Sequence, residues 1–302
     1  MKSWSEIARG AEVSLLPDHR RHEITKPRIP PCATDSPFQN VKSDEALAME
    51  LQTQHSTVTA PGAVREDPKV VTLDDAQNSE EVVAGADSKK ERPKTQMRVF
   101  EFTKENVEHL KSVAAAPELT RADCVSAHLW RTVVRARGLP RHALVRLWVL
   151  LEGRKKLGLP PGYFGNVVGL TFAMATVDEV LSKPLAHLAS LIHSSVSSVS
   201  GEYFLNFVDW IELNGDDIMA ASVPLGLNRD TGVSYLNRFP FYELDFGFGI
   251  PSYATRNNLG AWDGLVHIVP GHRNPYDLVA MANLNSEVMP KFANLVHEFP
   301  TT

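Results

Sequence analysis

The chain has 302 residues, of which 43% are hydrophobic, and a formal net charge of -5. This is the composition of a globular protein that can bury a substantial core. The modest charge, without a long run of Lys or Arg, predicts no nucleic-acid partner and no membrane partner. Two cysteines, Cys32 and Cys124, are too few for a disulfide framework, so we expect a cytoplasmic protein.

A polar stretch separates the first residues from the rest of the chain. Residues 39–95 contain no Phe, Trp or Tyr and are interrupted by Pro and Gly, which is the composition of a flexible linker. We therefore divide the chain into an N-terminal part at 1–38, a linker at 39–95 and a main domain at 96–302. A short helix at 44–54 is the single element predicted within the linker.

Beyond the linker, apolar periodicity predicts strands and helices in mixed order. In chain order we expect a strand at 97–102, a helix capped by Thr103, a helix capped by Thr120 and ending near Gly138, buried strands at 144–154 and 167–177, a helix at 183–199, strands at 265–270 and 277–284, and an amphipathic helix at 288–299. No regular alternation of strand and helix is present. The expected architecture is α/β with a mixed sheet, not a dinucleotide-binding fold.

The segment YELDFGFGIP, at residues 242–251, combines an acid with closely spaced glycines. A phosphate-binding loop of this kind requires a helix directly after it, and Pro251 and the residues beyond it break any helical pattern. We interpret the segment as a tight loop in which Asp245 requires a partner if it is buried.

Residues 245–249, DFGFG, resemble the DFGWG signature of the BAHD family of acyl-CoA-dependent acyltransferases. The segments that share this resemblance are WSEIARG with ITKPRIPP, RADCVSAHLWRTVVRARGL, GRKKLGLPPGYFGNVVG, WDGLVHIVPG and LNSEVMPKF. The resemblance covers residues 1–31 and 96–302. It implies a mixed-sheet fold like that of chloramphenicol acetyltransferase, with acyl-CoA as co-substrate, an alcohol or amine as acceptor, and no permanently bound cofactor or metal.

The general base of that family is the histidine of an HxxxD motif, and none of the 11 histidines here is followed by Asp four residues later. The nearest spacing, His272 with Asp277, is one residue too long. The resemblance places the motif just before MKSWSEIARG, so we expect that most of the N-terminal domain is missing and that the chain corresponds to roughly the C-terminal two-thirds of the family. It would then be inactive by itself, self-associating through an exposed domain interface. The alternatives are a non-catalytic remnant that acts as a binding or interaction protein, and a truncated sequence.

The resemblance also assigns structural roles. It implies that Asp245 pairs with Arg154 and that the loop completed by Phe246, Gly247, Phe248 and Gly249 is architectural, with Phe248 an aromatic plug in place of the signature's Trp. In the YFGN segment, it implies that Tyr163, Gly165 and Asn166 serve a turn near the domain junction.

The segment SYLNRFPFYE, at residues 234–243, corresponds to a stretch that lines the catalytic channel in the family. The resemblance makes Ser234 and Leu236 the candidates for positioning the intermediate, although Leu236 stands where the family has Trp. An ordinary exposed serine at a strand edge is the alternative for Ser234. Because the preceding segment DDIMAASVPLG has no Arg to grip a carboxylate, shikimate is not expected as acceptor.

The histidines do not suggest a metal. His128 lies among apolar helix positions, where packing or solvation is the usual role of a single His. His267 and His272, with Asp263 or Asp277, lack a compact ligand spacing, and there is no GxSxG motif of a serine hydrolase.

Overall fold

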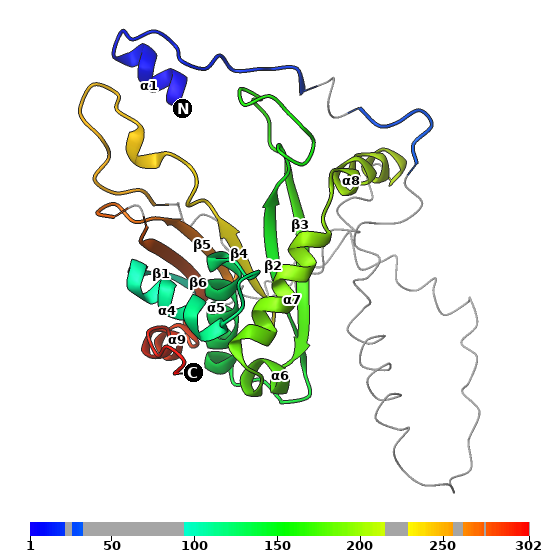
Figure 1. The fold of residues 1–302 in the computed structure, drawn as a ribbon, viewed down its shortest axis with the longest axis vertical. Coiled ribbons are helices and arrows are strands. Elements are labelled where there is room, and N and C mark those ends of the chain that lie inside the picture. The colour runs from blue at the N-terminus through cyan, green and yellow to red at the C-terminus, as the bar shows by residue number, and fades with distance from the viewer. Residues whose placement is uncertain (22–25, 33–93, 215–228, 256–261, 275, 302) are drawn as a thin grey trace, which may run out of the picture. The chain divides into compact units, whose positions relative to one another are not determined.

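The computed structural model describes residues 1–21, 26–32, 94–214, 229–255, 262–274 and 276–301. The linker predicted at 39–95, apart from its last two residues, and the helix predicted at 44–54 lie outside these ranges. The elements in chain order are α1 (Lys2–Ala8), β1 (Thr95–Phe102), α4 (Lys104–Ala114), α5 (Arg121–Arg137), β2 (Leu144–Glu152), β3 (Val168–Thr176), α6 (Val177–Ser182), α7 (Leu185–Ser198), α8 (Gly201–Asn214), β4 (Thr231–Tyr235), the 3-10 turn η4 (Phe241–Glu243), β5 (Leu265–Pro270), β6 (Leu278–Asn285) and α9 (Met289–Leu295) (Figure 1).

The six strands form one sheet in the order β1-β6-β5-β4-β2-β3. Strand β4 is parallel to both of its neighbours, β2 and β5. The pairs β1–β6, β5–β6 and β2–β3 are antiparallel. The predicted mixed-sheet α/β architecture is therefore confirmed.

The helix starts follow from side chains that cap them. The hydroxyls of Thr103 and Thr120 each accept a hydrogen bond from the backbone N–H three residues later, and the Asn106 and Asp123 side chains bond back, which completes two capping boxes. Helix α5 ends at Arg137, which confirms the predicted end near Gly138, and Gly138 adopts the left-handed conformation. The capping box of Thr176 that begins α6 was not predicted.

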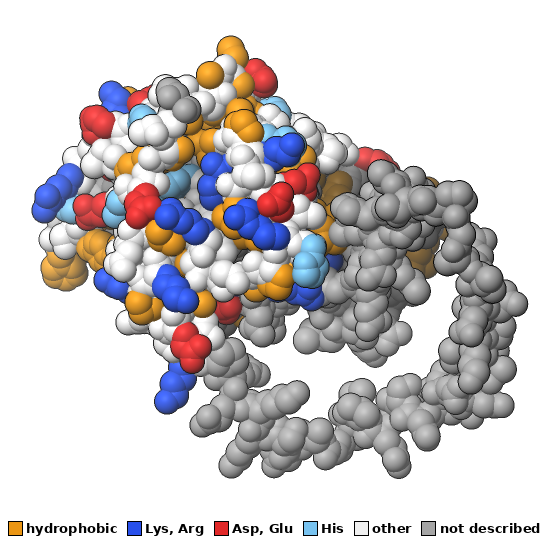
Figure 2. Space-filling view, turned by 90° about the horizontal axis from the view of Figure 1, so that it is seen from below, with side chains coloured by type: hydrophobic (Ala, Val, Ile, Leu, Met, Phe, Trp, Pro, Cys, Tyr) orange, Lys and Arg blue, Asp and Glu red, His pale blue; other side chains and the backbone are white. Residues whose placement is uncertain are grey.

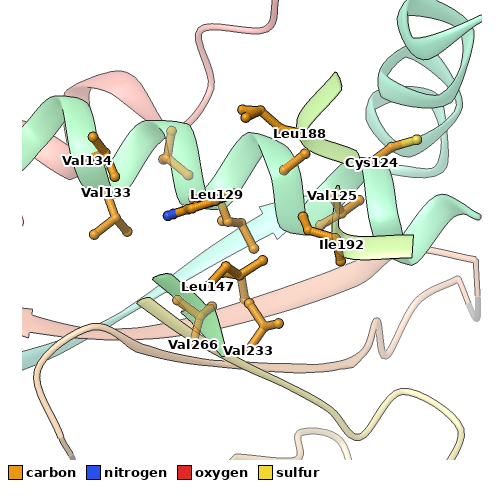
Figure 3. Close-up of a cluster of buried hydrophobic side chains, with 14 of the residues drawn as sticks. Cys124, Val125, Leu129, Val133, Val134, Leu147, Leu188, Ile192, Val233 and Val266 are labelled. Atoms are coloured by element: carbon orange, nitrogen blue, oxygen red, sulfur yellow. The ribbon is translucent and has the colours of Figure 1, made fainter. Parts of the chain in front are cut away.

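One face of the sheet packs against helices. Figure 3 shows side chains of α5 and α7 above Leu147 of β2, Val233 of β4 and Val266 of β5. Since successive side chains of a strand point to opposite faces, the residues that follow Val233 and Val266 point away from these helices. Those residues are Ser234 and His267.

The face opposite the helices is covered in part by the segment that follows β4. Leu236 and Phe241 of this segment pack against a small cluster formed by Val269, Val279 and Met281. The backbone N–H of Leu236 donates to the carbonyl of Ile268 at 2.7 Å, which ties the start of the segment to β5. Elsewhere on the surface, Figure 2 shows a face of the described residues on which basic and acidic side chains are interspersed.

Candidate functional site

Ser234 lies in the middle of the sheet. Strand β4 runs between β2 and β5, and Ser234 stands opposite Leu150 on one side and His267 on the other. Its side chain is 7% exposed. The alternative of an exposed serine at a strand edge is therefore wrong, because β4 has a partner strand on both sides. Within the part of the chain that the structure describes, the Ser234 hydroxyl makes no hydrogen bond.

His267 is the neighbour of Ser234 on β5 and is 5% exposed. Adjacent strands lie about 4.8 Å apart, so the hydroxyl and the imidazole leave the same face of the sheet side by side. The next residue in this cross-strand row is Met281 of β6. Neither of the two ladder neighbours of His267 carries a charge.

Asn283 of β6 is a further polar side chain on this face. It stands opposite Leu265, two residues before His267, and is 2% exposed. Its amide nitrogen donates to the carbonyl of Trp262 at 3.0 Å. Its amide oxygen is buried and has no hydrogen-bond partner among the described residues. The sequence prediction missed this residue because it lies in an apolar run, and its polarity there was the signal available.

Leu236 extends the face by one more position. It follows Ser234 by two residues, so both belong to the same side of the chain, and it packs on the cluster that includes Val269 and Met281. An aliphatic side chain thus stands beside the polar row where the family has an aromatic one.

Asp245 shapes the loop by accepting backbone hydrogen bonds. One of its carboxylate oxygens accepts from the N–H groups of Gly247 at 2.8 Å and of Gly249 at 3.0 Å. These bonds lower the pKa of Asp245 below its ordinary value, and the bond from Gly247 has the largest effect. Gly247 and Gly249 have φ angles of 99° and 94°, a region that favours glycine, so the spacing of the motif follows from the turn itself.

The predicted ion pair between Asp245 and Arg154 is not formed among the described residues. Asp245 lies 3.9 Å from Arg9 instead, and its side chain is 28% exposed. Arg154 donates to Glu152 at 2.7 Å and to the carbonyl of Gly165 at 2.5 Å. The prediction assumed a buried carboxylate, whereas this one is solvated and already has backbone donors, so no arginine is required.

The aromatic residues of the loop differ in their environments. Phe246 contacts Trp4 of α1 edge to face, with ring centroids 5.6 Å apart. Phe248 is 98% exposed, so the expected aromatic plug is wrong. The loss of the indole donor at this position costs no internal hydrogen bond, because the side chain points into solvent.

The YFGN segment is irregular, with a bend at Gly165. Tyr163 is buried and pairs in an isolated bridge with Asp18. A Cβ atom at Gly165 would lie 2.7 Å from the Tyr163 ring, so only glycine fits under that ring. Asn166 is exposed. A role in the turn for these residues stays a prediction.

The other histidine and aspartate candidates have separate surroundings and different partners. His128 is buried, with its Nε2 2.8 Å from the carbonyl oxygen of Val296, so of the two expected roles, packing and solvation, packing is the one observed. His272 is exposed. Asp263 receives a hydrogen bond from Arg137 at 2.9 Å, and Asp277 receives one from the backbone of Lys104 at 2.7 Å.

Two absences hold for the residues that the structure describes. No three His, Cys, Asp or Glu side chains gather there closely enough to hold a metal ion. Nor does any helix of these residues combine the length and the apolar character that crossing a membrane requires.

Known proteins with similar sequences are plant hydroxycinnamoyl transferases. Putrescine hydroxycinnamoyltransferase 3 of Oryza sativa subsp. japonica is 35% identical over 179 residues, which cover 57% of this chain and 41% of that protein. Shikimate O-hydroxycinnamoyltransferase of Nicotiana tabacum is 24% identical over 306 residues, covering 99% of this chain and 62% of that protein. This chain thus spans less than two thirds of the length of these relatives.

Similar folds occur in solved acyltransferase structures. F. sporotrichioides TRI101, complexed with coenzyme A and T-2, superimposes with a TM-score of 0.60 and 22% identity over 67% of this chain and 49% of that one. Vinorine synthase superimposes with a TM-score of 0.54 and 20% identity over 66% and 47%. The Transferase family matches residues 1–298. The chain therefore belongs to the Transferase family, that of the BAHD acyltransferases.

Proposed function

We propose that this chain transfers an acyl group from acyl-CoA to an alcohol or amine acceptor. The match of the Transferase family over residues 1–298 carries this proposal. The buried hydroxyl of Ser234 agrees with it, because it stands in a central strand at the place where the family has a hydroxyl in the channel. Acyl-CoA is the co-substrate, and no permanently bound cofactor is required.

An aliphatic amine is the acceptor class we propose first. Two putrescine hydroxycinnamoyltransferases of Oryza sativa subsp. japonica are 35% and 36% identical to the chain over 57% of its length. The shikimate enzyme of Nicotiana tabacum is 24% identical. The segment DDIMAASVPLG, which lies outside the described residues, has no Arg for a carboxylate and favours the same choice.

A non-catalytic role is the second candidate function, and the missing HxxxD motif favours it. A general base contributes typically ~10²–10⁴-fold to a rate. Without a replacement for that base, the chain would bind acyl-CoA or associate with another copy or a relative, and would release CoA slowly or not at all.

The experiment incubates purified chain 1–302 with hydroxycinnamoyl-CoA or acetyl-CoA and, in separate reactions, putrescine, agmatine or shikimate. Free CoA thiol and acylated product are followed together, and a reaction without acceptor is the control. Acceptor-dependent product, largest with an amine, supports acyl transfer. Binding of acyl-CoA without product in any reaction would reject catalysis and support the second candidate.

A further inference from the structure

We propose that His267 and Ser234 form the acceptor site of this chain, with His267 taking the proton from the attacking amine or alcohol. This inference rests on the proposed function, since it assigns a base to the acyl transfer. Five observations lead to it: the row that the two residues share, their burial, the chemistry of an amine acceptor, the positions of the other histidines, and the orphan oxygen of Asn283.

The row is unusual because it places a hydroxyl beside an imidazole between apolar neighbours. Leu150 precedes Ser234 in the row, and Met281 follows His267. A buried polar side chain has a free-energy cost unless it is hydrogen-bonded, and the Ser234 hydroxyl makes no hydrogen bond within the described part of the chain, so a bound polar group would lower that cost. Both lie on the sheet face that points away from α5 and α7. The preceding residues, Val233 and Val266, lie on the face that these helices cover (Figure 3).

The other described histidines do not offer this combination. His128 is buried, but it bonds the Val296 carbonyl and stacks on Phe299 with ring centroids 5.2 Å apart, so the helix packing holds it. The rest are exposed or partly exposed: His19, His109, His142, His187, His193, His272 and His297. Among the described residues, His267 alone is a buried histidine on the face that carries Ser234.

Amine chemistry requires such a group. An aliphatic amine has a pKa near that of Lys, about 10.4, so it is mostly protonated at neutral pH and must lose a proton to attack. That first proton goes to solvent, because an imidazole, with an ordinary pKa near 6.5, is a much weaker base than the free amine. The proton that an imidazole can accept is the second one, which the neutral amine loses as it attacks. The lone pair of the neutral amine or of the alcohol forms the new C–N or C–O bond to the thioester carbonyl carbon, the C–S bond breaks, and the N–H or O–H proton lost in this step passes through His267 to the CoA thiolate.

The side chain of Asn283 adds a hydrogen-bond acceptor, its amide oxygen, to this face. Its amide nitrogen donates to the Trp262 carbonyl, and this bond fixes the orientation of the amide group. The buried amide oxygen has no hydrogen-bond partner among the described residues. A diagonal pair across neighbouring strands is separated by about 7–8 Å, within reach of a small molecule that bridges the two side chains. The oxygen would accept a hydrogen bond from a second N–H of the acceptor.

The test compares His267→Gln with His272→Gln, an exposed histidine that we place outside the site. We expect His267→Gln to lower kcat by ~10²–10⁴-fold with little change in the KM for acyl-CoA. His272→Gln should stay within about twofold of the wild type. Equal kcat values for wild type and His267→Gln would overturn the proposal.

A second measurement does not depend on turnover or on how well the variant folds. In wild-type protein with isotope-labelled histidine, the His267 ring signal, assigned through its correlation with the backbone signals of the same residue, is followed while putrescine is added. A shift of that signal, with the His272 signal unmoved, supports the acceptor site even if no product forms, in which case the acyl-transfer proposal alone fails. An unmoved His267 signal at saturating putrescine and acyl-CoA would overturn the site whatever the activity.

Discussion

At the scale of single residues, burial decides which polar groups need a side-chain partner. Asp245 was expected to need an arginine, but its carboxylate is partly exposed and accepts two backbone N–H groups, so the turn alone satisfies it. Asn283 is the opposite case, because burial leaves its amide oxygen without a partner among the described residues. Whether a polar side chain needs a side-chain partner therefore depends on its exposure, which the sequence does not give.

The loop of Asp245 offers a test that separates backbone strain from side-chain packing. Gly247→Ala should lower the free energy of unfolding by about 1–2 kcal/mol, because φ is 99° there while no atom lies within 4 Å of an added Cβ. Phe248→Trp should stay within about 0.5 kcal/mol, because that side chain is 98% exposed. Urea unfolding of both variants measures this, and an equal loss for the two would contradict a strain-based account.

His128 predicts a pH dependence of stability. Burial lowers the pKa of His128 in the folded protein, although the bond to Val296 opposes this. The unfolded chain therefore binds a proton at higher pH than the folded one. This contribution to stability is fully present above the unfolded value of about 6.5 and is lost as the pH falls below it toward the folded pKa.

The measurement is urea unfolding of wild type and His128→Gln at pH 7.5 and 5.5. The wild type should lose more stability between the two pH values than the variant, because glutamine keeps a donor for the Val296 carbonyl but does not titrate. Parallel losses in the two proteins would show that His128 does not contribute to the pH dependence.

At the scale of elements, capping side chains explain which helices could be predicted. Helices α4 and α5 each begin after a Thr that is followed by Asn or Asp three residues later. The predicted capping of both helices by Thr is confirmed. Helix α6 has the same capping box at Thr176, but its first residue, Val177, was placed in the strand predicted at 167–177, and residues 178–182 were assigned to no element. Helix α8 follows α7 after a short break and was not predicted at all.

The capping box of α5 can be tested directly. Thr120→Ala should lower the free energy of unfolding by about 1 kcal/mol, because it removes the acceptor for the Asp123 N–H at 3.1 Å. Ser190→Ala, at an exposed position of α7, should be neutral or slightly stabilising, since alanine has the higher helix propensity. Differential scanning calorimetry compares the two; a Tm unchanged by Thr120→Ala would show that the cap is dispensable.

At the scale of the whole molecule, the N-terminal part and α8 are joined through one buried carboxylate. Asp209 of α8 is 1% exposed and accepts from the backbone N–H groups of Arg28 at 2.8 Å and Cys32 at 2.9 Å. The guanidinium of Arg28 also donates to it at 2.6 Å. Burial raises the pKa of Asp209, but these bonds outweigh burial and hold the pKa below its ordinary value.

This junction predicts a local effect on hydrogen exchange. Asp209→Ala should speed amide exchange at Arg28 and Cys32 strongly, because both N–H groups lose their acceptor. Glu202→Ala is the matched control: Glu202 contacts the Arg28 guanidinium at 2.5 Å but is largely exposed and bonds neither amide. Similar exchange at the two amides in both variants would argue against Asp209 as the anchor.

The sequence by itself determined the class of the fold, most strand and helix positions, two helix caps and the family motifs, because these depend on local periodicity and on residues a few positions apart. Tertiary structure decided which side chains meet. Ser234 and His267 are 33 residues apart and become neighbours only because β4 and β5 pair in parallel in one particular register. Asn283 reaches the same face only through the antiparallel pairing of β6. A shift of one residue in either ladder would turn these side chains to the helix-covered face, and no local pattern in the chain specifies that choice.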